Sequence, residues 1–388
     1  MKPIISFITP VYNNTRYLRF AIDSIINQVS LDSPIEIVIV DDGSTDGTSE
    51  LVDEIALLDS RIKTIHQDNQ WIYASFNNGI NIASGEYIYI LNSDDKLAEG
   101  AVETLLDSIK RYDYPDVIWT KVAWQNVDSD QNILNQFDMN PQITKDKYCG
   151  SELEVRDNWM LVKQSGLSLN QANLYMRKLA LDHPFRNDYY AGDSFFNVSI
   201  ARDITSMLFL EKPIYNYLAY NDSQLNASIG KFYGYEHRMF NELLDEELKL
   251  ASVWDLTKEF YEYLIVSRMR TMSYEIDTLS YAGCKMTCME KVDYIFSTIA
   301  DSWIRELAKK IGREREYESR ILTGTRKFLC NCGIEKDIPD YVSVLIRNLP
   351  ENYLDNCNPS IDMKEIGVAI DNEKNVDKIG KIYFSTRW

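Results

Sequence analysis

Basic residues, cysteine and long apolar runs are scarce in this 388-residue sequence, and each scarcity argues against a class of protein. Lysine and arginine total 41 against 59 acidic residues, which gives a formal net charge of -18. Because a nucleic-acid binder needs a basic surface, nucleic acid is not expected as a partner. The same charge weakens non-specific attraction to anionic lipid, although a local basic patch would escape this argument.

Apolar stretches long enough to span a membrane, about 18 residues, do not occur. The start also lacks the apolar segment and cleavage site of a signal peptide, so we expect a cytoplasmic protein and leave peripheral membrane contact open. Six cysteines are too few for a disulfide scaffold. The spacings Cys284 to Cys288 and Cys330 to Cys332 do not match a paired zinc site, so free thiols are expected.

What the sequence does contain is an alternation of apolar β-prone runs with segments of helical periodicity. Strands are predicted at 4–9, 35–40, 62–66, 88–91 and 117–119, with helices at 15–29, around 51–58, at 71–83 and at 99–111. Such alternation predicts an α/β fold with a doubly wound, mostly parallel sheet. Residues 122–170 are polar and are interpreted as an irregular connection or flap, before further strands at 168–176 and 206–219.

Helical periodicity dominates from about residue 230, over 235–275, 289–312 and 314–330. We therefore predict two domains, an α/β domain at 1–230 and a mainly helical domain at 231–388, with a short strand at 382–384. The aromatic residues of 232–282 have helical spacing and are expected to pack in a core.

An apolar run ends abruptly in acidic side chains at residues 88–95, which read IYILNSDD. In open α/β sheets, ligands bind just beyond the carboxyl ends of the strands. Asp94 and Asp95 would offer the oxygen ligands that a hard divalent cation prefers, and such a cation neutralises a diphosphate. The alternative is a strand followed by an ordinary acidic turn. A parallel sheet would bring Tyr12, Asp42 and Asp94 to one crevice.

Five motifs, in order, resemble the family 2 glycosyltransferases with the GT-A fold. They are ITPVYN at 8–13, VDDGSTDG at 40–47, GEY at 85–87, NSDD at 92–95 and Gly192-Asp193. PIYNY at 213–217, followed by Ser223, is similar to the strand pair that usually follows. The resemblance covers roughly residues 3–228, and it implies a Rossmann-like GT-A catalytic domain followed by a helical region.

The resemblance also implies roles for individual residues. The donor nucleotide would be bound by Pro10, Tyr12, Asp42, Asn92 and Ser93, the cation Mn²⁺ or Mg²⁺ by Asp94 and Asp95, and the catalytic base would be Asp193. A carboxylate can accept the imide N–H of uracil, and a tyrosine ring can stack on the base. From the residues alone, Tyr12 could be a packing residue, while Asp42, Asp95 and Asp193 could each cap a helix.

The implied activity is that of an inverting, metal-dependent hexosyltransferase of the bacterial surface-glycan type. It would move a sugar from a nucleotide donor, most simply a UDP-sugar, to a saccharide or lipid-linked saccharide acceptor. The C-terminal helices would contact the acceptor, a partner or a second copy in a homo-oligomer. The sequence does not specify the sugar, the acceptor or the linkage.

Three departures from the family pattern keep a second hypothesis open. Asn92 replaces the first aspartate of Asp-x-Asp, Gly192 replaces the glutamate before the base, and Phe76 replaces an arginine. These changes fit a catalytically weak or inactive protein that binds nucleotide sugars or acts as a scaffold. A nucleotidyltransferase is disfavoured because residues 8–15 contain no glycine for a phosphate loop.

Overall fold

The structure is a computed structural model of the chain, and it describes residues 2–128, 130–165, 167, 170–220, 231–256, 258–281 and 283–331. Two compact units divide the chain, Met1–Leu225 and Asn226–Trp388. The strand expected at 382–384 lies outside the described residues, as does Cys332.

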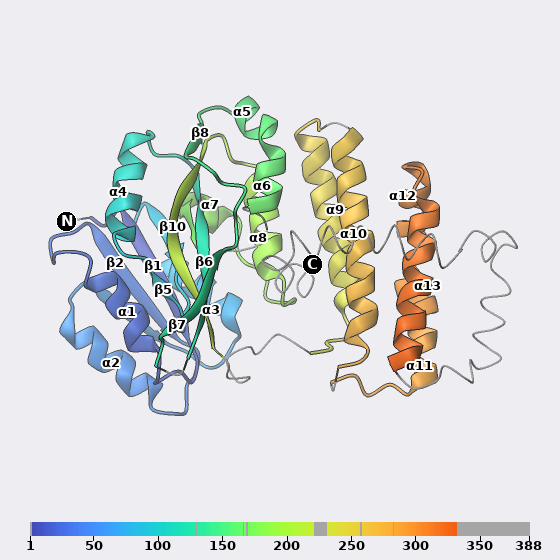
Figure 1. Cartoon of the computed structure of the whole chain (residues 1–388). Helices are drawn as coiled ribbons and strands as arrows, with labels where there is room; N and C mark the ends of the chain where they lie inside the picture. The colour runs from blue at the N-terminus through green and yellow to red at the C-terminus, as the bar shows by residue number, and fades with distance from the viewer. Residues whose placement is uncertain are drawn as a thin grey trace, which may run out of the picture. The chain divides into compact units, whose positions relative to one another are not determined.

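One mixed sheet forms the centre of the first unit (Figure 1), with the strand order β3-β2-β1-β4-β9-β6-β10-β5 and with β7 beside β6 and β8 beside β10. The strands are β1 (Ile5–Val11), β2 (Ile35–Asp41), β3 (Ile62–His66), β4 (Tyr87–Ile90), β5 (Lys96–Leu97), β6 (Val117–Val127), β7 (Ile133–Asp138), β8 (Lys147–Cys149), β9 (Asn173–Met176) and β10 (Met207–Tyr220). Strand β1 is parallel to β2 and β4, β2 to β3, and β6 to β10, whereas β9 is antiparallel to β4 and β6. The predicted mostly parallel α/β sheet is confirmed.

The helices of this unit are α1 (Leu18–Ile26), α2 (Thr48–Leu58), α3 (Ile72–Ile82), α4 (Ala101–Arg111), α5 (Glu152–Asp157), α6 (Trp159–Ser165), α7 (Arg177–Asp182) and α8 (Gly192–Ala201). The order β1, β2, β3 runs outward along the sheet, and the chain then returns to β4 on the other side of β1. Because parallel crossovers are right-handed, α1 and α2 cover one face and α3 covers the other (Figure 1). The reversal of direction between β1 and β4 creates the switch point where such sheets bind ligands.

Two local predictions were wrong. The segment 122–170 is largely ordered, because β6 continues to Val127 and pairs with β10 along its whole length, a strand about 90 residues further along the chain. The first helix begins at Leu18 and not near Thr15, because Asn13 adopts φ 49° and the Asn14 Oδ1 accepts the Tyr17 N–H at 3.2 Å.

The second unit is mainly helical, as predicted. Its described elements are α9 (Glu236–Val253), α10 (Lys258–Thr278), α11 (Cys288–Tyr294), the π-helix η1 (Ile295–Ile299), α12 (Ser302–Lys310) and α13 (Glu314–Asn331). The expected continuous helix over 235–275 is two helices, which are interrupted near Asp255 at φ 50°. No helix in the described parts of either unit has the length and apolar character needed to cross a membrane.

Candidate active site

Three loops at the carboxyl ends of β1, β2 and β4 are fastened to one another by two asparagines. The Asn13 N–H donates to Ser44 Oγ at 2.9 Å, which joins the first loop to the second. The Asn14 N–H donates to Thr48 Oγ1 at 2.8 Å, and its side-chain amide donates to Ser93 Oγ at 3.0 Å. Neighbouring parallel strands end at the same edge of a sheet. These bonds hold the three loops together at that edge, which is where the sequence predicts a crevice.

Of the residues predicted to bind the nucleotide, Pro10 is buried one residue before the end of β1, while Tyr12 follows that strand and is 52% exposed. The Asp42 carboxylate is buried and accepts hydrogen bonds from Gln67 Nε2 at 2.7 Å, Gln70 N at 2.8 Å and Trp71 N at 3.0 Å. These bonds hold the loop that leads into α3, so Asp42 does not cap the helix that follows it. An exposed aromatic ring and a fixed carboxylate therefore lie at the ends of adjacent strands.

Gly43 is the residue that allows this loop to approach. Its φ of 77° lies in the left-handed region, and a Cβ there would lie 2.8 Å from Asn69 N and 3.2 Å from the Gln67 carbonyl oxygen. Any other residue would force the 67–71 loop away from Asp42. Both residues of the Asp42-Gly43 pair are therefore needed: the carboxylate binds the 67–71 loop, and the glycine leaves room for it.

The two aspartates after β4 lie in different surroundings. The Asp95 carboxylate is buried and accepts hydrogen bonds from Tyr215 Oη at 2.5 Å and from Leu218 N at 2.8 Å, both on β10. Asp94 keeps some exposure but lies deep among protein atoms, and this burial raises the pKa of its carboxyl. Among the described residues, no side chain donates a hydrogen bond to the Asp94 carboxylate. Asp95 therefore anchors the loop, whereas Asp94 keeps its oxygens available.

Asn92 carries a second available oxygen. Its Oδ1 is shielded from solvent and has no hydrogen-bond partner among the described residues, while its side-chain amide donates weakly to Asp95 Oδ2 at 3.4 Å. A buried carbonyl oxygen without a donor is unfavourable unless a ligand satisfies it. The loop thus presents an amide oxygen and a carboxylate, both of which suit a hard cation or a ribose hydroxyl.

A divalent cation fits this arrangement only in part. The described residues contain no group of three side chains able to hold a metal ion by themselves. Magnesium is commonly held by one or two carboxylates together with the phosphates of a substrate. Asp94 with Asn92 matches that arrangement, so a bound donor would have to complete the site. Cys284 and Cys288 carry thiols that form no disulfide with another described residue.

The predicted base Asp193 lies in the first turn of α8 and is almost completely buried. Its Oδ1 accepts the Ser194 N–H at 3.0 Å. Ala191 occupies the N-cap position, so Asp193 is not the cap of this helix. The loop before it is tied to α3 through Tyr73 Oη, which donates to the Tyr190 carbonyl at 2.6 Å. Because α3 begins at the loop bound by Asp42, the start of α8, where Asp193 lies, is linked through α3 to the Asp42 loop.

The structure gives a shared reason for two departures from the family pattern. A Cβ at Gly192 would lie 2.7 Å from Tyr73 Cε2 and 2.6 Å from the Arg186 carbonyl oxygen, so no larger residue fits there. The Tyr73 ring lies 6.0 Å from Phe76, and Phe76 lies 5.1 Å from Phe185. Aromatic packing occupies the region where the family pattern carries a glutamate and an arginine.

Several residues that shape the site were not found from the sequence. Asn14, Trp71, Tyr73 and Tyr215 each contact a predicted site residue or its loop. Their partners lie up to 123 residues away in the chain, as in the Asn92 N–H to Tyr215 Oη contact at 3.3 Å. The only available signal was the PIYNY segment, which includes Tyr215 but does not reveal what its hydroxyl binds.

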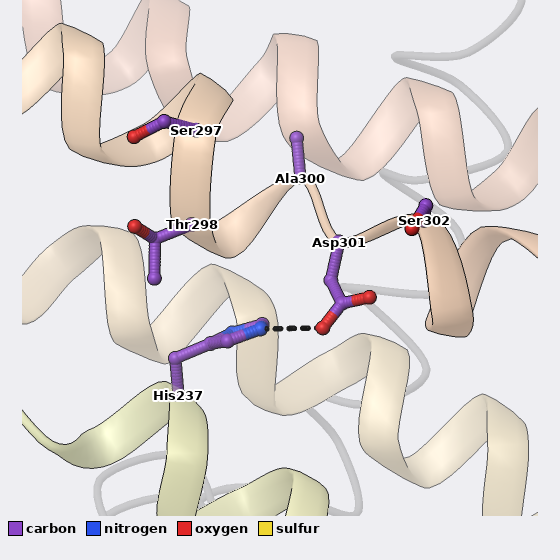
Figure 2. Close-up of a pocket in the computed structure, with 6 residues that line it drawn as sticks. All are labelled: His237, Ser297, Thr298, Ala300, Asp301 and Ser302. Atoms are coloured by element: carbon purple, nitrogen blue, oxygen red, sulfur yellow. Dashed lines mark hydrogen bonds and ion pairs between the residues drawn. The ribbon is translucent and has the colours of Figure 1, made fainter.

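A second polar cluster lies in the helical unit, beside a cavity of about 520 Å³. Figure 2 shows the His237 ring of α9 facing the Asp301 carboxylate, a contact of 3.0 Å. The other ring nitrogen of His237 lies 2.7 Å from Glu275, and Arg268 also bonds to Glu275. Asp301 in addition caps α12 through the Trp303 N–H at 2.6 Å. These charges satisfy one another and connect α9, α10 and α12, so the cluster is best explained by stability.

The geometry at the first unit agrees with comparisons to known proteins. Residues 6–164 match the family model described as Glycosyl transferase family 2. This chain therefore carries a family 2 glycosyltransferase domain, and the resemblance seen in the motifs is confirmed.

Among curated relatives, the chain is 34% identical over 167 residues to "Glycosyltransferase GlyG" of Streptococcus pneumoniae serotype 4. This match covers 43% of this chain and 52% of that protein. It is 26% identical over 264 residues to "GalNAc(5)-diNAcBac-PP-undecaprenol beta-1,3-glucosyltransferase" of Campylobacter jejuni, which covers 67% and 80%. This chain spans no more than 61% of the length of three other curated relatives that it matches.

The solved structure of S. aureus TarS 1-349 is similar in fold, with a TM-score of 0.54 and 17% identity, over 86% of this chain and 92% of that one. The expected fold, a GT-A-like α/β domain followed by a helical region, is confirmed.

Proposed function

We propose that this protein is an inverting, metal-dependent glycosyltransferase that moves a hexose from a nucleotide sugar, a UDP-sugar, to a saccharide or lipid-linked saccharide in bacterial surface polysaccharide synthesis. The family domain supports the reaction class. The UDP donor is supported by TarS structures titled as complexes with UDP-GlcNAc and with UDP. A lipid-linked acceptor is supported by the name of the Campylobacter relative.

One observation carries the proposal. The loop after β4 holds the Asp94 carboxylate and the Asn92 Oδ1 deep in the protein, and neither oxygen receives a side-chain hydrogen bond from the described residues. The same loop is fixed from two sides, by Asn14 on Ser93 and by Tyr215 on Asp95. Oxygens that are held rigidly and left unsatisfied indicate a ligand that supplies positive charge or hydrogen-bond donors.

The proposed reaction is a single displacement. Asp193 accepts the proton of the acceptor hydroxyl, the acceptor oxygen forms a bond to the anomeric carbon, and the bond from that carbon to the nucleoside diphosphate breaks on the opposite face. Inversion at the anomeric carbon follows. Tyr12 and Asp42 hold the base and ribose, and Asp94 with Asn92 orients the diphosphate. A bound Mn²⁺ or Mg²⁺ supplies positive charge that neutralises the leaving diphosphate.

Thermal unfolding with ligands tests the donor assignment. UDP together with Mn²⁺ should raise the melting temperature more than UDP alone, because a ligand that binds only the folded state stabilises it by mass action. Mn²⁺ alone should have little effect, since the diphosphate completes the cation site. A panel of nucleotide sugars followed by mass spectrometry then identifies the donor. No shift with UDP in either condition would contradict the proposal.

The second candidate is a protein that binds nucleotide sugars with little or no catalysis. It is favoured by Gly192, because the space of the usual glutamate is filled by Tyr73. Both candidates bind UDP, but only the enzyme releases UDP from its donor at a measurable rate. Donor hydrolysis with and without Mn²⁺ separates them.

For the two units we propose a division of roles at the predicted boundary near residue 230. Every residue proposed to bind the donor lies before residue 100, whereas the long helices begin at Glu236. A fragment of residues 1–230 should bind UDP, and the helical region should be needed for transfer to the acceptor. A soluble fragment with full transfer activity would contradict this division. Contacts of the helices with a partner or a second copy are tested by measuring the mass in solution.

A further inference from the structure

Trp71 adopts a backbone conformation that is unfavourable for its side chain. It precedes α3 with φ 81° and ψ 156°. This region is accessible essentially to glycine alone, because a Cβ clashes with the adjoining peptide groups. A tryptophan there is held against a local energy cost.

The surroundings of Trp71 enforce this conformation. Its N–H donates to Asp42 Oδ2 at 3.0 Å, and its carbonyl oxygen accepts the N–H groups of Ala74 at 3.1 Å and Ser75 at 3.3 Å. The backbone is therefore fixed from both directions. The indole is 49% exposed, and no other ring of the described residues stacks on it. Core packing therefore does not explain why this position carries a large aromatic side chain.

The position of Trp71 in the site is the second observation. Asp42 joins it to the strand end beside Tyr12, since the Asp42 N–H donates to the Val11 carbonyl at 2.9 Å. On the other side, Asn187 Nδ2 donates to the carbonyl of Gln70 at 2.8 Å, and Asn187 belongs to the loop that leads to Asp193. Trp71 therefore lies on the segment that bridges the nucleotide side and the base side. Strained residues that persist through such restraints cluster at functional sites.

We propose that the Trp71 indole is a platform on which the hexopyranose ring of a substrate lies. The inference rests on the proposed glycosyltransferase function. The apolar C–H face of a pyranose packs on an aromatic face, and the indole N–H can bond to a hydroxyl at the ring edge. A rigid backbone presents the indole at a fixed angle, so little ordering is needed when the sugar binds. The ring belongs either to the donor sugar or to the terminal sugar of the acceptor.

Glycine and alanine substitutions separate strain from function. Trp71→Gly and Trp71→Ala both remove the indole, but only glycine relieves the backbone. We expect Trp71→Gly to melt at a higher temperature than Trp71→Ala, the reverse of the order at ordinary positions. Both should lower kcat/KM about tenfold or more, while Trp71→Phe, which keeps a ring, should stay within about threefold of wild type.

Tyr114→Gly is the matched control. Tyr114 is also aromatic, has φ 56° and is 39% exposed, but it precedes β6 and so lies at the amino edge of the sheet. Its replacement by glycine should relieve a positive φ at an exposed aromatic residue and leave kcat/KM unchanged.

Two measurements identify the sugar. A loss of affinity for the UDP-sugar, with unchanged affinity for UDP, indicates the donor ring, and a higher KM for the acceptor indicates the acceptor ring. The inference would be overturned if neither the affinity for the UDP-sugar nor the KM for the acceptor changed. It would also be overturned if Trp71→Ala were at least as heat-stable as Trp71→Gly. Failure of the proposed function itself is recognised separately, because the wild-type protein would then show neither a thermal shift with UDP nor turnover of a UDP-sugar.

Discussion

Two carboxylates at opposite edges of the same sheet show how differently one fold treats a buried charge. Glu36, near the start of β2, is 4% exposed and accepts hydrogen bonds from Ser6 Oγ at 2.6 Å, Gly85 N at 3.1 Å and Ser84 Oγ at 2.8 Å. Lys63 forms an ion pair with it at 2.7 Å. Although burial alone would raise its pKa, these partners lower the pKa of Glu36 to about 2. At the carboxyl edge, burial raises the pKa of Asp94 because comparable partners are missing among the described residues.

The difference teaches which edge is built for stability and which for binding. Gly85 of the GEY motif lies at the satisfied edge, and a Cβ there would lie 2.8 Å from Ser6 N. That motif therefore serves packing around Glu36. The NSDD motif lies at the unsatisfied edge, where an ionised Asp94 lowers the stability of the free protein, as is expected of a residue whose proposed role is to bind a ligand. Substitutions at the two edges should consequently have opposite effects on stability and function.

The largest effect is expected for Asp193→Asn. Asn cannot accept the hydroxyl proton, so turnover should fall about 100- to 10,000-fold while affinity for UDP stays near wild type. Asp188→Asn is the control, because Asp188 is half exposed and paired with Arg186 at 2.6 Å. Turnover and UDP affinity are measured for both, with circular dichroism as the check on folding. If Asp193→Asn kept more than roughly a tenth of wild-type turnover, the base would have to be sought at Asp188.

Asp94→Asn should separate stability from donor binding. At neutral pH the raised pKa means that the ionised carboxylate is less favourable in the folded than in the unfolded protein, so its removal should maintain or raise the melting temperature without ligand. The additional shift caused by Mn²⁺ in the presence of UDP should disappear, and turnover should fall. Thermal shift with UDP, with and without Mn²⁺, measures both. A variant that is less stable and still responds to Mn²⁺ would show that Asp94 is structural.

Local sequence signals were sufficient for much of the first unit but not for its long-range pairings. Strands β1 to β4 and helices α1 to α4 come from apolar periodicity and turn residues, which are local properties. The length of β6 was missed because it is set by β10, and β10 pairs with it from Met207 to Tyr220. Residues 122–127 read VAWQNV, but the polar residues that follow conceal how far this strand extends, and its length is fixed by that partner.

For the site, the motifs pointed to residues that the structure places on neighbouring loops, but they did not separate the roles proposed for those residues. Asp94 and Asp95 are adjacent and chemically identical, and hydrogen bonds from Tyr215 and Leu218, 120 and 123 residues later, make Asp95 the anchor. The strain at Trp71 leaves no mark in the sequence, because φ is set by Asp42 and the first turn of α3. Contacts of this kind depend on tertiary structure, so residue type and spacing do not encode them.

Glu36→Gln should have the reverse pattern of Asp94→Asn. It should lower the free energy of unfolding by roughly 2 kcal/mol at neutral pH, with UDP affinity unchanged. Because the folded pKa is about 2, the contribution of Glu36 is fully present above about pH 4.5 and is lost as the pH falls toward 2. Urea unfolding at several pH values should therefore show the gap between variant and wild type closing in acid. Glu54 is the control, because it forms an ion pair at 4.0 Å with Arg19 and both side chains are largely exposed. Glu54→Gln should leave the free energy of unfolding nearly unchanged over the same pH range.

The smallest effect is expected at Tyr12, and it completes the contrast with Glu36. Tyr12 is 52% exposed, so Tyr12→Ala should leave the melting temperature without ligand almost unchanged. If its ring stacks on the base, the loss should weaken UDP binding by about 1 kcal/mol or more, at least fivefold, while Tyr12→Phe should bind nearly as wild type. Isothermal titration with UDP for both variants measures this. Unchanged affinity in Tyr12→Ala would place the base elsewhere, and the carboxyl edge would then owe its binding to Asp42 and the loop after β4 alone.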